Sequence, residues 1–324
     1  MFRKINIIGL GLIGGSLARC CKKYHLGDKI FGYDQDDSQN KFAFNNQIID
    51  QVFNFKNIEE NELIIICSPL FSYDEIFRKI QPLISQKTLI IDIGSLKEFT
   101  FPLAKEILQE KAKNFIACHP IAGSEKSGIL NSKEDLFFNK KVLISKSLIN
   151  EERDINKIEQ FWQKIGSKPE FIDAKKHDEI FALVSHFPQF LAFAAQEDFQ
   201  DSDDKILNHH FRLQNSNLKM WREIFDLNRV NIEYYLQFYL KNIDNMIALL
   251  NEEKYENTKT KREALVYCFL NLPNIEKFKK YAGSGFKDFT AINHNLKKPK
   301  ILAENKDSLI KFLNNIKSKI HELK

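Results

Sequence analysis

Short apolar runs alternate with longer amphipathic segments over the first half of the chain. A strand buried on both faces reads as a continuous apolar run, whereas a surface helix repeats its apolar positions every three or four residues. Alternation of the two kinds of segment at this spacing is typical of a parallel sheet covered by helices. A further predicted helix, Glu151–Ile165, ends at Gly166. The predicted strands are Ile5–Ile8, Lys29–Tyr33, Leu63–Cys67, Thr88–Ile91, Asn114–Cys118, Lys141–Ser145 and Pro169–Ile172.

The pattern changes at about Lys175, after which long helical repeats replace the alternation. We therefore predict an α/β domain over residues 1–174 and an all-α domain over residues 175–324. One predicted helix, Asn231–Leu250, carries an apolar face made of Ile232, Tyr235, Leu236, Tyr239, Ile243, Ile247 and Leu250. A last one carries a coiled-coil-like seam at steps of 4, 3 and 4, made of Leu309, Leu313, Ile316 and Ile320. Such seams either cover the core of their own domain or form a dimer interface, and the pattern leaves both open.

The composition indicates sizeable cores and no membrane span. Hydrophobic residues make up 43% of the 324 residues, and the chain contains 28 Phe. No apolar run approaches the roughly 20 residues of a membrane helix. The chain opens with a strand-like segment, Phe2–Ile8, in which we see no targeting peptide. Five cysteines without metal-ligand spacing are interpreted as structural thiols, so we expect a cytoplasmic protein without a metal site.

The formal net charge of +5 is small and unevenly distributed. Residues 276–324 carry twelve Lys against five acidic residues, a net charge of +7, which leaves −2 for the rest of the chain. These lysines are spread around a helical pattern without interleaved aromatic residues, which indicates a solvated surface rather than a nucleic-acid groove. We expect neither nucleic acid nor a membrane as a partner.

The first predicted strand runs directly into a glycine-rich segment at the start of a helix. In such a segment Gly9 permits a tight turn, Gly11 lets the backbone approach a pyrophosphate, and Gly14 lets the helix pack closely on the strand. The free N–H groups of the helix N-terminus then face the phosphates. The alternative is a glycine-rich turn in an α/β domain that binds no nucleotide. The position between strand and helix favours a Rossmann-type dinucleotide-binding domain, and the segment reads Gly9-Leu10-Gly11-Leu12-Ile13-Gly14.

The end of the second predicted strand distinguishes between the two nicotinamide cofactors. Asp34 lies 20 residues after Gly14 and is followed by Gln35, Asp36 and Asp37, without an arginine. A carboxylate at this point accepts hydrogen bonds from ribose hydroxyls and repels a 2′-phosphate. The predicted cofactor is therefore NAD rather than NADP.

Two polar segments follow other predicted strands, at the edge where open α/β sheets bind ligands. They are Asp92–Lys97 (DIGSLK) and His119–Gly128 (HPIAGSEKSG). A lone histidine after a strand is more often structural than catalytic. Here His119 shares its sheet edge with Ser95 and the glycine-rich segment, so we interpret it as a candidate general base near neutral pH.

Together with two later segments, these motifs resemble the prephenate dehydrogenase family. The later segments are Val184–Pro188 (VSHFP) and Met220–Phe225 (MWREIF), with Arg212 upstream of the second. The resemblance spans roughly residues 4–250 and depends on the order and spacing of the motifs. It implies a Rossmann-type domain followed by a helical domain of the 6-phosphogluconate dehydrogenase-like kind, and a homodimer formed through the helical domain. It also implies NAD-dependent oxidative decarboxylation of prephenate to 4-hydroxyphenylpyruvate, in tyrosine biosynthesis.

The resemblance further implies roles for individual residues. His119 would take the proton of the substrate's ring hydroxyl, and Ser95 would orient both groups. An arginine would pair with a substrate carboxylate through its bidentate guanidinium. The implied substrate-binding residues are His186, Arg212, Ser124 and Glu125, and the implied cofactor-binding residues are Gly9, Gly11, Leu12, Ile13, Gly14, Asp34 and Ser68.

The chain departs from the family pattern in one place. The family usually carries a glycine-rich Phe-(Lys/Arg)-Asp-Phe-Thr-Arg segment before its Met-Trp-Arg helix, but residues 205–212 read KILNHHFR and keep the arginine alone. A closer match, Gly283–Thr290 (GSGFKDFT), comes later and is followed by Ala291 instead of arginine. A partial duplication, or a late loop that completes the pocket within the chain or across a dimer, would explain this. We favour Arg212 as the functional arginine.

Three alternative functions stay open on the sequence. Arogenate carries an ammonium where prephenate carries a keto group, and the neutral Gln189 beside the Val-Ser-His segment favours prephenate. A β-hydroxyacid dehydrogenase would share the glycine-rich segment but would use a catalytic lysine from its helical domain. An NAD-sensing regulator would not need Ser95, His119 and His186 together. Product analysis and the activity of a His119→Asn variant separate these functions.

Overall fold

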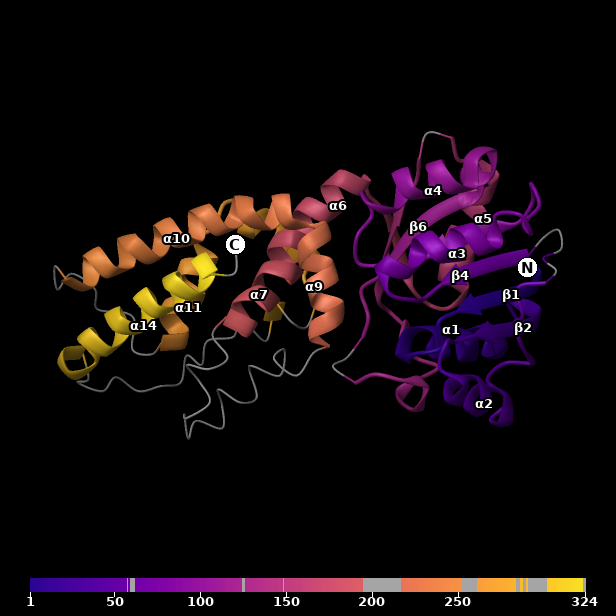
Figure 1. The fold of residues 1–324 in the computed structure, drawn as a ribbon, viewed down its shortest axis with the longest axis horizontal. Coiled ribbons are helices and arrows are strands. Elements are labelled where there is room, and N and C mark those ends of the chain that lie inside the picture. The colour runs from indigo at the N-terminus through magenta and orange to yellow at the C-terminus, as the bar shows by residue number, and fades with distance from the viewer. Residues whose placement is uncertain are drawn as a thin grey trace. The chain divides into compact units, whose positions relative to one another are not determined.

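The computed structural model describes residues 1–56, 58, 62–123, 126–147, 149–194, 217–251, 261–283, 286–287, 290 and 302–322. The chain divides into two compact units, Met1–Asp178 and Glu179–Lys324, which we call the α/β unit and the helical unit. In Figure 1, indigo to magenta follows the α/β unit, and orange and yellow mark most of the helical unit.

Within the described residues, an eight-stranded sheet forms the centre of the α/β unit (Figure 1). Its order is β3-β2-β1-β4-β5-β6-β7-β8, so the chain progresses outward from β1 in one direction and then from β4 in the other. The carboxyl ends of β1 and β4 therefore form the switch point at which open α/β sheets bind ligands. The strands are β1 (Phe2–Ile8), β2 (Gly27–Tyr33), β3 (Gln51–Val52), β4 (Glu62–Ile66), β5 (Leu89–Asp92), β6 (Phe115–Pro120), β7 (Lys141–Ser145) and β8 (Lys168–Phe171).

One strand pair differs from the parallel sheet that the sequence predicts. All neighbouring strands are parallel except β6 and β7, which are antiparallel. Parallel pairing requires a long crossover, whereas the described residues between β6 and β7 contain a single short 3₁₀ turn, Ile129–Asn131. The predicted helix Glu151–Ile165 is confirmed as α5 (Glu152–Lys164), after which Gly166 adopts φ +84°. This helix provides the crossover that makes β8 parallel to β7.

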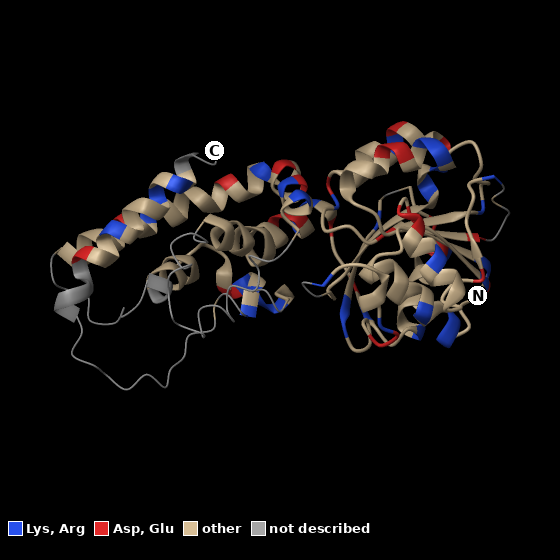
Figure 2. Cartoon of the chain, turned by 60° about the horizontal axis from the view of Figure 1, so that its bottom comes forward, with Lys and Arg blue, Asp and Glu red and all other residues tan. Residues whose placement is uncertain are grey.

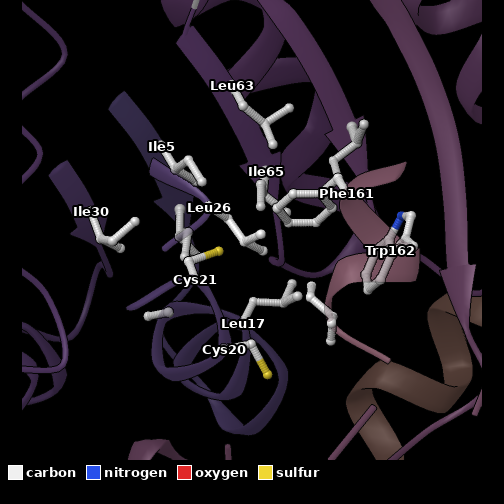
Figure 3. Close-up of a cluster of buried hydrophobic side chains, with 14 of the residues drawn as sticks. Ile5, Leu17, Cys20, Cys21, Leu26, Ile30, Leu63, Ile65, Phe161 and Trp162 are labelled. Carbon is white, nitrogen blue, oxygen red and sulfur yellow. The ribbon is translucent and has the colours of Figure 1, made fainter. Parts of the chain in front are cut away.

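Helices cover both faces of the sheet. On one face, Leu17 and Trp162 pack with Ile5 and Leu63 of the strands (Figure 3). Successive side chains of a strand point to opposite faces, so Ile64, the neighbour of Leu63, faces the other side. The helices of the α/β unit are α1 (Leu12–Lys23), α2 (Asp37–Asn45), α3 (Tyr73–Ile80), α4 (Thr100–Leu108) and α5, followed by α6 (Ala174–Phe181), in which the division between the units falls.

The helical unit buries the apolar faces predicted from the sequence. All predicted face residues of α10 are buried except Ile247, which is half-buried, and Met246 is buried beside it. The seam from Leu309 to Ile320 on α14 is also buried, and α14 packs against α7, α10 and α11. The seam therefore covers the core of its own unit. The helices are α7 (Phe187–Ala194), α9 (Leu218–Leu227), α10 (Arg229–Asn251), α11 (Lys261–Leu270), α12 (Ile275–Phe278) and α14 (Leu302–Glu322).

Charged residues of both signs are distributed over the helices of each unit (Figure 2). On the basic helix α14, Lys317 pairs with Asp244 of α10. Across the described part of the chain, we find no helix that is long and apolar enough to cross a membrane. The five cysteines are unpaired, and four of them are buried.

Candidate active site

The glycine-rich segment forms the turn from β1 into α1. Gly9 has φ +97°, where an L side chain is strained, and a Cβ there would lie 2.6 Å from the Cys67 carbonyl oxygen. A Cβ on Gly14 would lie 1.8 Å from the Gly9 carbonyl oxygen, whereas a Cβ on Gly11 would meet no atom within 4 Å. The protein itself therefore excludes side chains at Gly9 and Gly14. At Gly11 the backbone is open, as the approach of a phosphate requires.

Asp34 follows β2, and the backbone of the turn fixes its carboxylate. Leu10 N–H donates to Asp34 Oδ2 at 2.7 Å, and Asp36 N–H donates to Oδ1 at 3.0 Å. The Asn40 side chain bonds both the N–H and the carbonyl oxygen of Asp34, at 2.7 and 2.8 Å. An ionised carboxylate has about four acceptor positions. Each Asp34 oxygen therefore keeps capacity for a ribose hydroxyl.

Ser68 lies beside the same turn, just after β4. A Cβ on Gly9 would lie 3.0 Å from the Ser68 nitrogen. Ser68 Oγ is buried and has no hydrogen-bond partner in the described structure. A buried hydroxyl normally has a partner, and a bound dinucleotide would supply one here. The open Gly11, the fixed Asp34 and this hydroxyl fit a dinucleotide. Among the described residues, no group of His, Cys, Asp and Glu could hold a metal ion.

A buried ion pair holds the segment that follows β5. Lys97 Nζ lies 2.6 Å from Asp92 Oδ2, and both side chains are fully buried. Tyr73 OH and Cys118 N–H also donate to the Asp92 carboxylate, at 3.2 and 3.0 Å. Burial raises the pKa of the Asp92 carboxyl, and the Lys97 ammonium opposes that rise. Ser95 lies between the two charged residues in the sequence, so its loop is anchored at both ends.

Near the end of β6, the half-buried His119 begins a chain of hydrogen bonds. Its Nδ1 lies 2.8 Å from His177 Nε2, and His177 Nδ1 lies 2.7 Å from Asp178 Oδ1. The Asp178 carboxylate accepts the backbone N–H groups of Lys97 at 2.9 Å and Glu98 at 2.8 Å. Burial lowers the pKa of His177 well below its usual value, and the Lys97 charge adds to this effect. His119 is thus connected, through a neutral histidine, to the loop that carries Ser95.

The segment after His119 returns to the helices beside the glycine-rich turn. Ile129 N–H donates to Gln39 Oε1 of α2 at 2.9 Å, and Arg19 Nε of α1 donates to Ser132 Oγ at 2.9 Å. A Cβ on Gly15 would lie 2.8 Å from Ile129 Cγ1. The two helices that flank the glycine-rich turn therefore position this segment. The predicted entrance residues Ser124 and Glu125 lie outside the described residues.

In the helical unit, His186 ends a π-helical turn, Ala182–His186, between α6 and α7. Turns of this kind are frequent at functional sites. His186 is buried, and its Nδ1 lies 2.9 Å from Asn228 Nδ2, while Asn228 Oδ1 accepts from Asn231 Nδ2 at 2.8 Å. An amide nitrogen donates, so His186 Nδ1 accepts and its Nε2 carries the hydrogen. Trp221 of the Met-Trp-Arg helix packs edge-on against this imidazole.

The remaining candidates of the helical unit are described only in part. Arg212 lies outside the described residues, as do residues 284, 285, 288 and 289 of the Gly283–Thr290 segment. In the described part of that segment, Phe286 is buried against Phe269 of α11, with ring centroids 5.7 Å apart. Phe286 therefore takes part in core packing.

Sequence reasoning missed four residues of these networks: His177, Asp178, Lys97 and Asn228. The sequence alone does not show which strand end lies next to the His177-Asp178 pair. Lys97 belongs to the polar segment Asp92–Lys97, but a lysine at a strand end is usually solvated, so the sequence does not indicate its burial. The buried ion pair and hydrogen bonds near His119 identify His177, Asp178 and Lys97, and the hydrogen bond to His186 identifies Asn228. Both signals are visible only once the fold is known.

Two protein-family models identify the family to which this chain belongs. The nucleotide-binding domain of prephenate dehydrogenase matches residues 17–170, and the dimerization domain of prephenate dehydrogenase matches residues 173–262. The chain belongs to the prephenate dehydrogenase family. Its fold class is confirmed as a Rossmann-type domain followed by a helical domain, and it is an NAD-dependent oxidoreductase.

Individual relatives agree with the family models. The prephenate dehydrogenase of Bacillus subtilis (strain 168) is 28% identical over 271 residues, which cover 78% of this chain and 71% of the relative. The prephenate dehydrogenase of Lactococcus lactis subsp. cremoris is 29% identical over 279 residues, covering 82% and 75%. Among solved structures, the prephenate dehydrogenase from Aquifex aeolicus in complex with hydroxyphenyl propionate and NAD+ superposes with a TM-score of 0.72 at 27% identity. It covers 78% of this chain and 92% of the Aquifex chain.

Proposed function

We propose that this enzyme converts prephenate to 4-hydroxyphenylpyruvate and carbon dioxide, as a step of tyrosine biosynthesis in the cytoplasm. The observation that carries the proposal is the position of His119. It lies near the carboxyl end of β6, beside β5, whose following loop carries Ser95. The same sheet contains β1, which leads into the glycine-rich turn. When bound, NAD accepts the hydride of the ring carbon that bears the hydroxyl. Loss of the ring carboxylate then makes the ring aromatic.

His119 is proposed as the base that takes the proton of the ring hydroxyl, with Ser95 orienting both groups. The ring carbon loses a hydride, and the electrons of the bond to the leaving carboxylate enter the ring. Prephenate and NAD+ give 4-hydroxyphenylpyruvate, carbon dioxide and NADH without a net proton. The proton taken by His119 therefore returns to the phenolic oxygen of the product.

The turn from β1 into α1 is proposed to bind the pyrophosphate, because Gly11 is open and has no side chain with which to cap the helix. Asp34 would bind the ribose through the capacity left on its two oxygens. The Ser68 hydroxyl, for which the described residues provide no hydrogen-bond partner, would bond the dinucleotide. The proposed cofactor-binding residues are Gly9, Gly11, Leu12, Ile13, Gly14, Asp34 and Ser68.

Substrate binding is proposed for His186, through the hydrogen on Nε2, and for Arg212, through a substrate carboxylate. Ser124 and Glu125 are proposed at the entrance. An Arg212→Ala variant is expected to bind prephenate weakly and NAD almost normally, as steady-state kinetics and NAD titration would show. Kinetics equal to those of the wild type would contradict the role of Arg212.

A homodimer is proposed through the helical unit. Val230, Tyr234 and Phe238 follow at steps of four on α10, and 81%, 47% and 39% of their surfaces are exposed. They lie within the region that matches a dimerization domain. Burial of this stripe by a second copy removes apolar surface from water. Tyr234→Glu with Phe238→Glu should convert a dimer to a monomer in light scattering, and a monomeric wild-type enzyme would contradict the proposal.

The reaction is tested by a steady-state comparison of prephenate and arogenate, each with NAD and with NADP. The expected result is the highest kcat/KM for prephenate with NAD, because Asp34 repels a 2′-phosphate and the neutral Gln189 directly follows the Val184–Pro188 segment. A higher kcat/KM for arogenate would contradict the choice of substrate. Turnover of a simple β-hydroxyacid in place of both would contradict the proposed function altogether.

A further inference from the structure

A base can take a proton only with a nitrogen that carries a lone pair. A neutral imidazole has one such nitrogen and one N–H, and the partner of either nitrogen decides which is which. In this structure His119 Nδ1 faces His177 Nε2 at 2.8 Å. The hydrogen of this bond is covalently attached to one of the two rings. The hydrogen bonds on the other side of His177 determine which ring carries it.

Asp178 determines the state of His177. Its carboxylate accepts two backbone N–H groups, from Lys97 and Glu98, and such bonds favour the charged form. An ionised carboxylate can only accept, so His177 Nδ1, at 2.7 Å from Oδ1, carries a hydrogen and donates it. The neutral His177 ring then has its lone pair on Nε2. His119 Nδ1 must be the donor of the bond between the two rings.

We infer that His177 is a positioning residue, which accepts the Nδ1–H of His119 and so leaves the His119 Nε2 lone pair as the base toward the substrate hydroxyl. This inference rests on the proposed function of His119. It adds an orienting role for His177 and an anchoring role for Asp178. Removal of the acceptor would free the ring to rotate and to place its hydrogen on Nε2, where it blocks proton transfer.

His177 is an acceptor in this chain and not a relay. Burial holds the pKa of His177 well below its usual value, and the Lys97 charge opposes a second positive charge nearby. A proton taken by His119 therefore stays on Nε2. From there it returns to the phenolic oxygen, as the balance of the reaction requires.

Two amide variants separate the two bonds of His177. A glutamine side chain reaches as far as the Nε2 position of histidine, so His177→Gln keeps an oxygen that can accept from His119 Nδ1. An asparagine reaches only the Nδ1 position, so His177→Asn keeps the contact with Asp178 and loses the acceptor for His119. We expect kcat for prephenate to fall about 10- to 100-fold in His177→Asn and to stay within about 3-fold in His177→Gln. The KM and Kd for NAD should change in neither variant.

The tautomer itself is read by ¹⁵N NMR of the histidine side chains in the full-length enzyme without substrate. Eight histidines are present, and the His119→Asn difference spectrum assigns the resonances of His119. In the wild type, Nδ1 of neutral His119 should be protonated and Nε2 should not. In His177→Asn, the two nitrogens should show a mixture of both forms. Thermal unfolding, followed by circular dichroism, checks that each variant is folded.

A protonated Nε2 on neutral His119 of the wild type would overturn the inference, and this measurement does not depend on the folding of any variant. Unchanged kcat and an unchanged tautomer in a folded His177→Asn variant would overturn it as well. Because the spectra need no substrate, they stay decisive even if prephenate is not oxidised. Failure of the proposed function would appear separately, as a wild-type enzyme without activity toward prephenate.

Discussion

Replacing Lys97 with methionine leaves Asp92 as a buried carboxylate without its ammonium partner. Both side chains are fully buried, and removal of one partner from such a pair costs about 3–5 kcal/mol. Tyr73 OH and Cys118 N–H still donate to the Asp92 carboxylate, which places the expected loss at the lower end, about 3 kcal/mol. For a unit of this size, that loss corresponds to a decrease in Tm of roughly 6–12 °C.

The chain allows the two units to be followed separately, because it contains two tryptophans, one in each unit. In a Trp221→Phe background, the fluorescence of the buried Trp162 reports on the α/β unit alone. Urea unfolding is measured for Lys97→Met and for a control, Lys41→Met, whose ion pair with Asp37 is exposed. The control should stay within about 0.5 kcal/mol of the parent.

The loss of stability in Lys97→Met, called the deficit below, should also depend on pH. Burial already raises the pKa of Asp92, and loss of Lys97 raises it further. The unfolded pKa of an aspartate is near 3.9. A carboxyl whose pKa is higher in the folded state stabilises the fold when the pH is below the unfolded pKa. This stabilisation is lost as the pH rises through the folded pKa. The deficit of Lys97→Met is therefore largest at neutral pH and shrinks on acidification, and a second substitution, Asp92→Asn, should recover part of it. A deficit below about 1 kcal/mol at pH 7, or one that grows in acid, would refute the reasoning.

Three further predictions concern the turn and the two histidines. Gly14→Ala should lower Tm and abolish NAD binding, because its Cβ meets the Gly9 carbonyl oxygen. Gly11→Ala should keep Tm and only weaken NAD binding, as calorimetric titration would show. Equal effects in the two variants would contradict the geometry of the turn. Asn228→Leu leaves His186 Nδ1 without its donor and should raise the KM for prephenate about 10-fold with unchanged Kd for NAD. The lowered pKa of His177 means that the unfolded chain binds an extra proton below about pH 6.5, so stability falls in acid by up to about 1.4 kcal/mol per pH unit. His177→Gln should lose less stability between pH 7 and pH 5 in urea unfolding, and an identical loss would contradict a neutral buried His177.

The sequence predicts the fold well where periodicity and chemistry agree. Apolar runs such as Leu63–Cys67 are unambiguous because both faces of their strands are buried, and Gly9, Gly14 and Gly166 take the turn and helix-end positions that their spacing predicts. The direction of β7 was not predictable, because it depends on a connection without a crossover helix rather than on the strand itself.

The sequence predicts the residues of the candidate site that lie in recognisable motifs, but not their hydrogen-bond partners. His119 and Ser95 were recognised because each follows a strand, but their partners come from distant segments. His177 is 58 residues from His119, and Asp178 is 81 from Lys97. Such contacts depend on tertiary packing of the loop after β5 against the start of α6, which no local pattern encodes.

The central claim is tested most directly by stopped-flow measurement of NADH formation from prephenate, in the wild type and in His119→Asn. The account predicts that the wild type forms NADH and 4-hydroxyphenylpyruvate in equal amounts. His119→Asn should bind NAD with the same Kd and react at least about 100-fold more slowly. An equal rate in the variant, or no NADH from prephenate in the wild type, would contradict the account.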